Sequence, residues 1–251
     1  MFYSFVLKLK LVDLETNSNL IKKFQNIGLL REILGKVKGS TISSFLTKDK
    51  EFNQGRIYFI RITSIDSKEI KEITKYLYEK KIFNEKITIQ NQIFLVEDII
   101  HNEENSRFSK QMLLQDFLDL KELESISIKF ITPTVFKFGE MEYFIPEPYL
   151  YFGGALKRFN LYFDESEIEN PLKNISSQIF KKINIVHKNI QKRVVTIDGK
   201  TQETFIGEAV YNIPKNELDL GKIVDCLSRF SFFSGVGQFT ERGLGQVLIE
   251  S

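Results

Sequence analysis

Residues 57–67 read IYFIRITSIDS and pass from a β-branched, aromatic run into two short polar side chains. Such a run is typical of a strand, and aspartate and serine are residues that cap the first turn of a helix. After this cap, Ile70, Ile73 and Leu77 recur at helical spacing. The stretch therefore predicts a strand at 57–65 followed by a helix at 67–81.

The residues on either side extend this pattern into a domain. Residues 2–12 alternate in polarity and predict a strand, whereas residues 19–34 repeat apolar side chains at helical spacing. Residues 35–44 are rich in Gly, Ser and Lys and predict a loop, and residues 87–96 predict another strand. The order β-α-β-α-β fits a ferredoxin-like unit of the βαββαβ type.

A polar stretch at 101–110 predicts a linker, so we expect one domain at 1–108 and a second at 109–251. The second half again alternates helical and strand patterns, and Asp198-Gly199 is a strong hairpin signal. The fold class expected is α+β with two tandem ferredoxin-like (RRM-like) domains. The predicted helices of the second half are 109–120, 148–164, 170–182 and 216–233, and the strands are 125–131, 183–195, 204–213 and 247–249.

The composition excludes several classes of protein. With 42% hydrophobic and 27% charged residues, the 251-residue chain does not have the composition of a disordered protein. It has no apolar run long enough for a transmembrane helix and no signal-peptide pattern, so we expect a cytoplasmic protein. One cysteine, Cys226, and two histidines, His101 and His187, argue against a disulfide framework or a metal centre. We expect no cofactor, and the net charge of +2 requires any basic surface to be local.

Residues 235–245, GVGQFTERGLG, place four glycines in a G-x-G-x5-G-x-G pattern before the last predicted strand. Glycines allow positive φ angles, and successive free N–H groups in such a loop can bind phosphates. No Gly-Lys-Ser/Thr follows, and the loop does not open a helix after a strand, so it matches neither nucleotide-binding fingerprint. A flexible surface turn is the alternative interpretation.

The loop resembles the C-terminal glycine-rich loop of the CRISPR-associated RAMP superfamily, and most closely that of its precursor-crRNA-processing endoribonucleases. Residues 130–136, FITPTVF, resemble that family's F-x-T-P-T-x-F strand end. Residues 146–160, PEPYLYFGGALKRFN, resemble its P-x-P-x-L…L-x-R-W-N helix, and residues 41–45 and 58–66 resemble segments of its first half. The matches are ordered and extend over about residues 30–250.

The resemblance implies a metal-independent endoribonuclease that binds CRISPR repeat RNA and cleaves precursor crRNA. In that family the ribose 2′-OH attacks the adjacent phosphate and leaves 2′,3′-cyclic phosphate and 5′-OH ends. The alternative is a non-catalytic crRNA-binding subunit of a CRISPR effector complex, and a filament-forming backbone subunit is more remote. Effector-complex subunits and a homodimer stay open as partners, and no membrane is expected.

Many members of the family carry a histidine in a Leu-His-Asp/Glu triplet, where this chain has Leu30-Arg31-Glu32. An arginine stays protonated and is a poor base, but it can bind and stabilise a phosphate. We therefore expect Arg31 with Lys36 or Lys38 to stabilise charge, and Ser43 to position the RNA by donating a hydrogen bond. The alternative is a solvated helix end and loop. His101 is expected at the surface.

The remaining candidates are RNA contacts rather than catalytic groups. Basic side chains on the predicted helix after Pro148 and on the predicted hairpin strand favour phosphate contacts, although a solvated strand face is equally open for the hairpin. Phe239 in the glycine-rich loop could stack on a base. The predicted RNA-binding residues are Lys157, Arg158, Lys188, Lys192, Arg193, Gly235, Gly237, Gln238, Phe239, Thr240, Arg242, Gly243 and Gly245. Cys226 is expected in the core.

Overall fold

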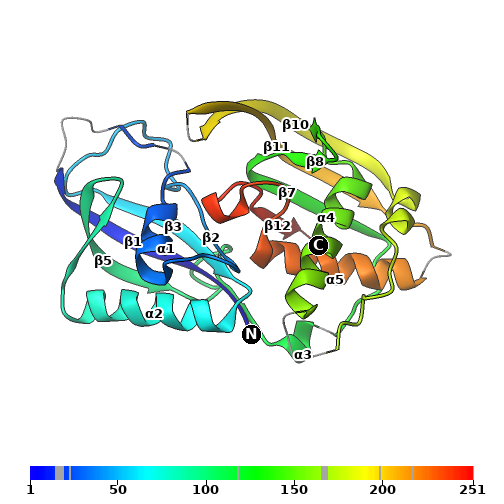
Figure 1. Cartoon of the computed structure of the whole chain (residues 1–251), viewed down its shortest axis with the longest axis horizontal. Coiled ribbons are helices and arrows are strands. Elements are labelled where there is room, and N and C mark those ends of the chain that lie inside the picture. Colours follow the sequence, from blue (N-terminus) through cyan, green and yellow to red (C-terminus); the bar gives the residue numbers. More distant parts are fainter. Residues whose placement is uncertain are drawn as a thin grey trace. The chain divides into compact units, whose positions relative to one another are not determined.

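The computed structural model describes residues 1–14, 20–22, 24–117, 119–164, 169–197, 199–215 and 218–250, and Figure 1 shows its helices and strands. The chain forms two compact units. Unit 1 comprises Met1–Leu113 together with Glu241–Gly243, and unit 2 comprises Leu114–Thr240 together with Leu244–Ser251. The domain limits of 1–108 and 109–251 stay a prediction about which segments fold independently.

Unit 1 has the strand order of a ferredoxin-like domain. Its sheet runs β2-β3-β1-β5-β4 with antiparallel neighbours, and β6 pairs with the start of β1. Strand β1 thus lies between β3 and β5, and helices form the two connections, as in the split βαβ arrangement. The elements are β1 (Phe2–Leu14), α1 (Ile27–Leu34), β2 (Ser40–Ile42), β3 (Ile57–Ser64), α2 (Ser67–Ile82), β4 (Lys86–Ile89), β5 (Gln92–Ile100) and β6 (Lys110–Met112).

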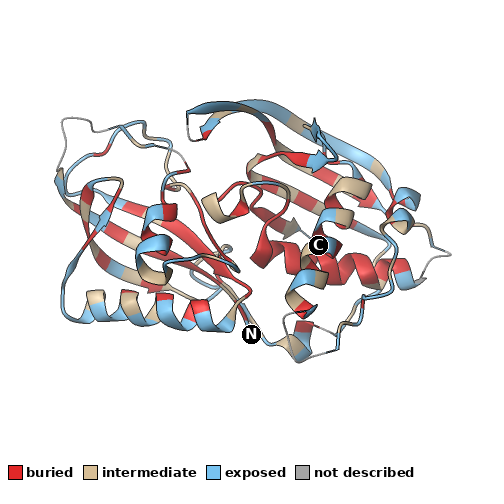
Figure 2. Cartoon of the chain, viewed as in Figure 1, coloured by how far each residue is buried: buried red, intermediate tan, exposed pale blue. Residues whose placement is uncertain are grey.

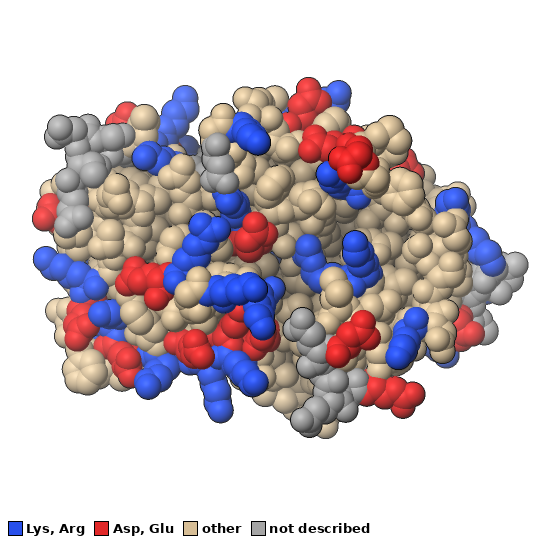
Figure 3. Space-filling view, in the orientation of Figure 1, with Lys and Arg blue, Asp and Glu red and all other residues tan. Residues whose placement is uncertain are grey.

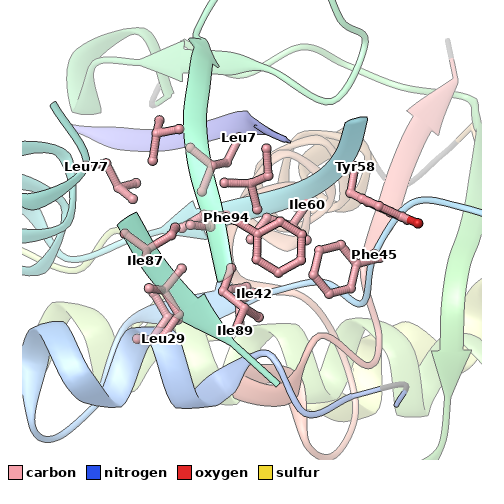
Figure 4. Packing of buried hydrophobic residues seen from close by; sticks show 14 of the residues in the cluster. Leu7, Leu29, Ile42, Phe45, Tyr58, Ile60, Leu77, Ile87, Ile89 and Phe94 are labelled. Atoms are coloured by element: carbon pink, nitrogen blue, oxygen red, sulfur yellow. The ribbon is translucent and has the colours of Figure 1, made fainter. Parts of the chain in front are cut away.

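One apolar core holds unit 1 together. Alternate residues of β1 point to the same face of the sheet, and Leu7 and Leu9 on that face are fully buried among apolar residues of α1 and α2. At one end of this core the rings of Phe45 and Phe94 stack with centroids 5.5 Å apart, and Tyr58 lies edge-on to both. Figure 4 shows this packing. The helix positions are therefore fixed by burial of apolar area.

Unit 2 has the same strand order as unit 1. Its sheet runs β10-β11-β7-β12, again with antiparallel neighbours, and a small β8-β9 hairpin stands apart from it. The fold class predicted from the sequence is confirmed. The elements are α3 (Leu114–Phe117), β7 (Ser125–Thr134), β8 (Phe136–Phe138), β9 (Met141–Tyr143), α4 (Pro148–Asp164), the 3-10 helix η1 (Ser177–Lys182), β10 (Asn184–Ile197), β11 (Lys200–Asn212), α5 (Leu218–Ser234), the 3-10 turn η2 (Thr240–Arg242) and β12 (Val247–Glu250).

Helix α5 is buried along most of its length, as Figure 2 shows. Its small polar residues Ser228 and Ser231 are fully buried, and the Ser231 hydroxyl donates to the Leu227 carbonyl 2.7 Å away. Cys226 lies in the same helix and is fully buried, and burial raises the pKa of its thiol to about 12. The expected core position of this cysteine agrees with the structure.

Two predictions for unit 1 are wrong in their boundaries. The helix expected at 19–34 begins only at Ile27, and Leu20 instead forms a β-bridge with Glu51. Residues 15–19 and 23 lie outside the described residues. The loop expected at 35–44 contains β2, because residues 40–42 pair with β3. Periodicity alone extends a helix past its true start whenever the preceding segment is also apolar.

The strand expected at 87–96 is a hairpin of β4 and β5. Its turn residues, Gln90 and Asn91, both have positive φ angles of 55° and 59°. Two consecutive positive φ angles define the type I′ turn that suits a two-residue hairpin. Without a glycine at the turn, the apolar runs on either side read as one strand.

In the second half, the helix at 148–164 and the strand positions agree with the sequence. The helix expected at 109–120 is wrong, because residues 110–112 form β6 and α3 covers only Leu114–Phe117. The helix expected at 170–182 is reduced to the six-residue η1. Residues 118, 198, 216 and 217, which fall in the expected helices and in the Asp198-Gly199 turn, lie outside the described residues.

Candidate functional site

Three basic residues gather at the end of α1 and in the segment that follows. Arg31 lies in the last turn of the helix, and Lys36 and Lys38 follow the Gly35 cap, whose N–H donates to the Arg31 carbonyl at 2.8 Å. All three side chains are exposed. Cations are stabilised near a helix C-terminus, where unsatisfied carbonyls carry partial negative charge. Within the described part of the chain, none of the three has an ion-pair partner. We call Arg31, Lys36 and Lys38 the basic segment.

The carboxylate of Glu69 holds the backbone at Lys38, the last residue of the basic segment. It accepts hydrogen bonds from the N–H groups of Lys38 and Gly39, at 2.6 and 3.0 Å, and from the Ser40 hydroxyl at 2.7 Å. Glu69 lies in the first turn of α2 and is only 7% exposed. Sequence reasoning missed this residue, although Asp66 and Glu69 have the spacing of a capping box. Here Asp66 caps the helix and Glu69 instead binds the chain before β2.

Ser43 lies at the end of β2 and its hydroxyl is engaged within unit 1. The hydroxyl donates to the Ser44 carbonyl at 2.7 Å and accepts the N–H of Arg61 at 2.9 Å. The side chain is fully buried. These bonds hold β2 against β3, and the predicted role of Ser43 as a donor to RNA stays a prediction.

The glycine-rich loop uses many of its N–H groups internally. The N–H of Val236 donates to the Gly245 carbonyl at 2.8 Å, and the N–H of Gln238 donates to Val135 at 3.0 Å. The N–H of Gly245 donates to Pro133 at 2.9 Å. The sequence interpretation assumed free N–H groups in this loop. These three N–H groups are bonded internally and are therefore not free to bind phosphate. The loop joins α5 to β12 by bonding to the end of β7.

Two glycines of the loop are needed for close backbone contact. Gly245 has φ +67°, and a Cβ on it would lie 1.7 Å from the Val236 carbonyl oxygen. Gly243 has φ +84°, and a Cβ there would lie 2.1 Å from the Ile42 oxygen, within unit 1. Both residues are buried, so this part of the loop is not the flexible surface turn that was the alternative. Any other residue at these positions would force the backbones apart.

Arg158 positions this loop instead of presenting its charge to solvent. Its guanidinium donates to the carbonyls of Ser234 at 2.8 Å, Gly235 at 3.0 Å and Gly237 at 3.2 Å. These are the last carbonyls of α5 and the first of the loop, which attract a cation. These donors are used within unit 2. The predicted contact of Arg158 with an RNA backbone stays a prediction. Lys157, its neighbour on α4, is exposed.

The outer residues of the loop differ in exposure. Gln238 is exposed, Thr240 is buried, and Phe239 is half-buried with φ +58°. The Arg242 guanidinium lies 3.7 Å from the Glu241 carboxylate. The predicted stacking of Phe239 on a base, and the RNA contacts of Gly237 and the other loop residues, stay predictions.

Strand β10 is an edge strand and carries the basic residues of the hairpin. Lys188, Lys192 and Arg193 are all exposed. Lys188 pairs with Ala209 and Lys192 with Phe205, which places both lysines on the same face of the sheet. Arg193 points to the opposite face and donates to the Gln191 side chain at 2.7 Å. Figure 3 shows basic and acidic side chains interspersed over the face in view, so a basic surface here is local.

His101 is not the exposed linker residue that the sequence predicts. It follows β5 and is half-buried, with its ring stacked on Tyr78 at 5.9 Å and near Phe5 at 5.4 Å. Its Nε2 atom lies 2.8 Å from the Tyr78 hydroxyl. Burial lowers the pKa of His101, and the nearby Asp98 carboxylate partly offsets this. His187 on β10 is exposed.

Two kinds of feature are absent from the described residues. No three His, Cys, Asp or Glu side chains come together there as a metal ion would require. No helix in the described ranges combines the length and apolar character needed to cross a membrane.

Comparison with known proteins then identifies what the chain resembles. Residues 128–247 match the family model described as CRISPR-associated endoribonuclease Cas6, and comparison with the curated proteins gives no match. A Cas6 product complex aligns with TM-score 0.81 and 19% identity, covering 100% of this chain and 99% of that one. Thermus thermophilus Cas6 gives TM-score 0.76 at 18% identity, covering 100% and 98%. A Cas6-related protein from Pyrococcus furiosus gives 0.60 at 15%, covering 100% and 99%. The resemblance predicted from the sequence is confirmed, by sequence over residues 128–247 and by fold over the whole chain.

The hydrogen bonds to Glu69 should stabilise the fold of unit 1. Glu69→Ala leaves the N–H groups of Lys38 and Gly39 without their acceptor, so we expect the free energy of unfolding to fall by about 3 kcal/mol. Chemical denaturation measures this change. Glu72→Ala, which removes an exposed carboxylate from the same helix, should change stability by no more than about 0.5 kcal/mol. Equal effects of the two substitutions would contradict the assignment.

The half-buried His101 should make the stability of the fold depend on pH. Because burial lowers the pKa of His101, the folded protein binds this proton more weakly than the unfolded chain. The contribution of His101 to the free energy of unfolding is fully present above about pH 6.5, the pKa of a histidine in the unfolded chain. It is lost as the pH falls through the lowered pKa of the folded state. We expect His101→Gln to reduce the loss of stability between about pH 7.5 and about pH 5 in denaturant titrations. His187→Gln is the control and should leave that loss unchanged, and an NMR titration showing His101 above its ordinary pKa would refute the prediction.

Proposed function

We propose that this chain, which has the Cas6 fold throughout and the Cas6 family sequence over residues 128–247, binds CRISPR repeat RNA in the cytoplasm and cleaves precursor crRNA without a metal ion. The observation that carries the proposal is the basic segment. Its three cations are exposed and have no ion-pair partner among the described residues, and the backbone at Lys38 is tied to α2 through Glu69. By its spacing in the sequence, Arg31 would stand where the family's triplet has a histidine.

The proposed reaction transfers a phosphoryl group within the RNA, from the 5′ oxygen of the next nucleotide to the adjacent 2′ oxygen. The ribose 2′ oxygen bonds to the adjacent phosphorus, the bond from phosphorus to the 5′ oxygen breaks, and a cyclic phosphate remains. The 2′ proton leaves to solvent, because a guanidinium cannot accept it. Arg31 stabilises the extra negative charge on the phosphorus oxygens, and the ammonium of Lys36 or Lys38 protonates the departing 5′ oxygen.

The cost of lacking a histidine can be estimated. A positioned general base contributes roughly 10²–10⁴-fold to a rate, so a site without one is expected to be slow. Charge stabilisation by fixed cations supplies roughly 10²–10³-fold for each donor that is well placed. The attachment of the Lys38 and Gly39 backbone to Glu69 supports such placement, since a fixed backbone leaves less entropy to be lost when the side chain binds a phosphate.

Strand β10 supplies the RNA-binding part of the proposal. Lys188 and Lys192 are exposed on one face, and in β-strands residues four apart lie about 13 Å from each other along the strand. This spacing suits two phosphates of a single RNA strand better than one. Lysines act as point charges for phosphates and carry no sequence information. We propose that they hold the RNA while the basic segment acts on it.

A second candidate function is a non-catalytic carrier of crRNA. It is favoured by the absence of any histidine between residues 1 and 100 of the sequence. In this case the basic segment would bind phosphate without promoting cleavage. Partnership with effector-complex subunits and formation of a homodimer also stay predictions.

The deciding experiment incubates the protein in EDTA with end-labelled repeat RNA, beside copies with single 2′-deoxy substitutions. Metal-independent cleavage that one deoxy substitution abolishes would support the endoribonuclease. We expect Arg31→Ala to lower the cleavage rate by roughly 10²-fold and to change RNA affinity little. The matched control is Lys75→Ala, which removes an exposed charge from α2. Tight binding without cleavage by the unaltered protein favours the carrier.

A separate measurement tests β10. Each phosphate contact contributes to the salt dependence of RNA binding through counterion release. The double substitution of Lys188 and Lys192 by Ala should weaken binding and reduce the slope of log K against log salt concentration by roughly 1.5–2. Substituting Lys173 and Lys215 by Ala removes the same charge elsewhere in unit 2 and serves as the control. An equal loss of slope in both variants would remove β10 from the interface.

A further inference from the structure

Unit 2 contains a pocket that none of the predicted site residues except Lys157 touches. Its volume is about 580 Å³, within the usual range for ligand sites. It lies between the outer face of α4, the β8-β9 hairpin and the chain around Ser177. Figure 1 shows β8 beside α4, and Figure 3 shows basic side chains over α4.

The floor of the pocket is a stretch of bare helix. Gly153 and Gly154 lie in the middle of α4, and both line the pocket. A Cβ on Gly154 would meet nothing within 4 Å, and a Cβ on Gly153 would meet only the Ser177 Cβ at an ordinary 3.5 Å. Neither glycine has a positive φ. Packing therefore does not require them, although each lowers helix propensity by about 1 kcal/mol relative to alanine.

One wall of the pocket is aromatic. Phe138, at the tip of β8, is 52% exposed, and its ring lies edge-on to Tyr149 with centroids 5.7 Å apart. The ammonium of Lys181 lies 5.3 Å from the centre of the Tyr149 ring. An exposed ring beside cations is the combination on which bases of single-stranded nucleic acids stack.

The polar groups of the pocket complement a nucleotide. Lys137 and Lys157 line it and supply positive charge, and the Glu140 partner of Lys137, 3.4 Å away, is almost fully exposed and screens it weakly. The Asn160 side chain accepts from Asn170 through its oxygen, which leaves its amide hydrogens to donate. The Asp164 carboxylate at the pocket can accept from ribose hydroxyls or a base amine.

We infer that this α4 pocket binds one unpaired nucleotide of the RNA, with its base on the aromatic wall and its phosphate near the lysines. The inference rests on the proposed function, because it takes RNA as the ligand. It assigns a contact separate from β10 and from the basic segment. The helix glycines keep this space open, because a large side chain at Gly154 would occupy the position of the base or ribose.

The test uses two repeat RNAs, one with short unpaired extensions and one trimmed of them. The full-length protein should bind the extended RNA more tightly, by roughly five- to a hundredfold, the usual effect of one stacked base. Gly154→Leu should abolish this preference and leave binding and cleavage of the trimmed RNA unchanged. Because leucine favours helix, the same variant should keep or raise the melting temperature. If Gly154 only supported the fold, its replacement by leucine would not raise the melting temperature and at the same time remove the preference for extended RNA.

Gly154→Ala is the matched control, since it raises helix propensity with little added volume and should retain most of the preference. AMP, added as a free nucleotide, should compete with the extended RNA and not with the trimmed one. Equal binding of both RNAs by the unaltered protein, or an unchanged preference in Gly154→Leu, would overturn the inference while the proposed function stands. AMP binding without any preference for the extended RNA would also overturn it and assign the pocket to free nucleotides. Failure to bind either RNA would instead refute the proposed function.

Discussion

The contact between Gly245 and the Val236 carbonyl is the constraint on which the end of unit 2 depends. It lets the chain leave α5, bond to the end of β7 and return as β12 within about a dozen residues. The carbonyls left at the end of α5 would be costly without partners, and Arg158 supplies donors for them. Several N–H groups that this glycine-rich pattern would offer to a phosphate thus donate to the protein's own backbone carbonyls. The glycines serve close packing, so their presence alone does not identify a ligand site.

The basic segment is built in the opposite way. Its backbone is tied down through the buried carboxylate of Glu69, whereas its side chains remain exposed. A buried carboxylate with three donors is stable because each bond is charge-assisted. The cations themselves gain little stability from their positions, since surface charges without partners contribute weakly to folding. The arrangement of these cations is therefore better suited to binding an anion than to stabilising unit 1.

The sequence predicted the parts of the fold that local patterns control. The helix at 148–164 and the strand followed by a helix at 57–81 agree with the structure because periodicity, Pro148 and the Asp66 cap all act over a few residues. The β4-β5 hairpin was missed because Gln90 and Asn91 are not the usual turn pair. The site was harder to predict. Arg158 and Glu69 act on residues that are distant in sequence, by 76 positions for the Ser234 carbonyl, and no local signal reports such a partner.

Helix α4 shows how one element can serve packing and binding at once. Its inward face is fully apolar, with Tyr151, Phe152 and Phe159 buried completely, and Arg158 reaches the glycine-rich loop. These contacts determine where the helix lies. The outer face is then free of packing demands, and helix propensity alone would favour alanine or leucine there. Two adjacent glycines on that face are a local cost that the fold does not explain, and such costs are expected where a surface must accept a ligand. The aromatic and basic residues around these glycines suit the unpaired nucleotide that we propose as the ligand.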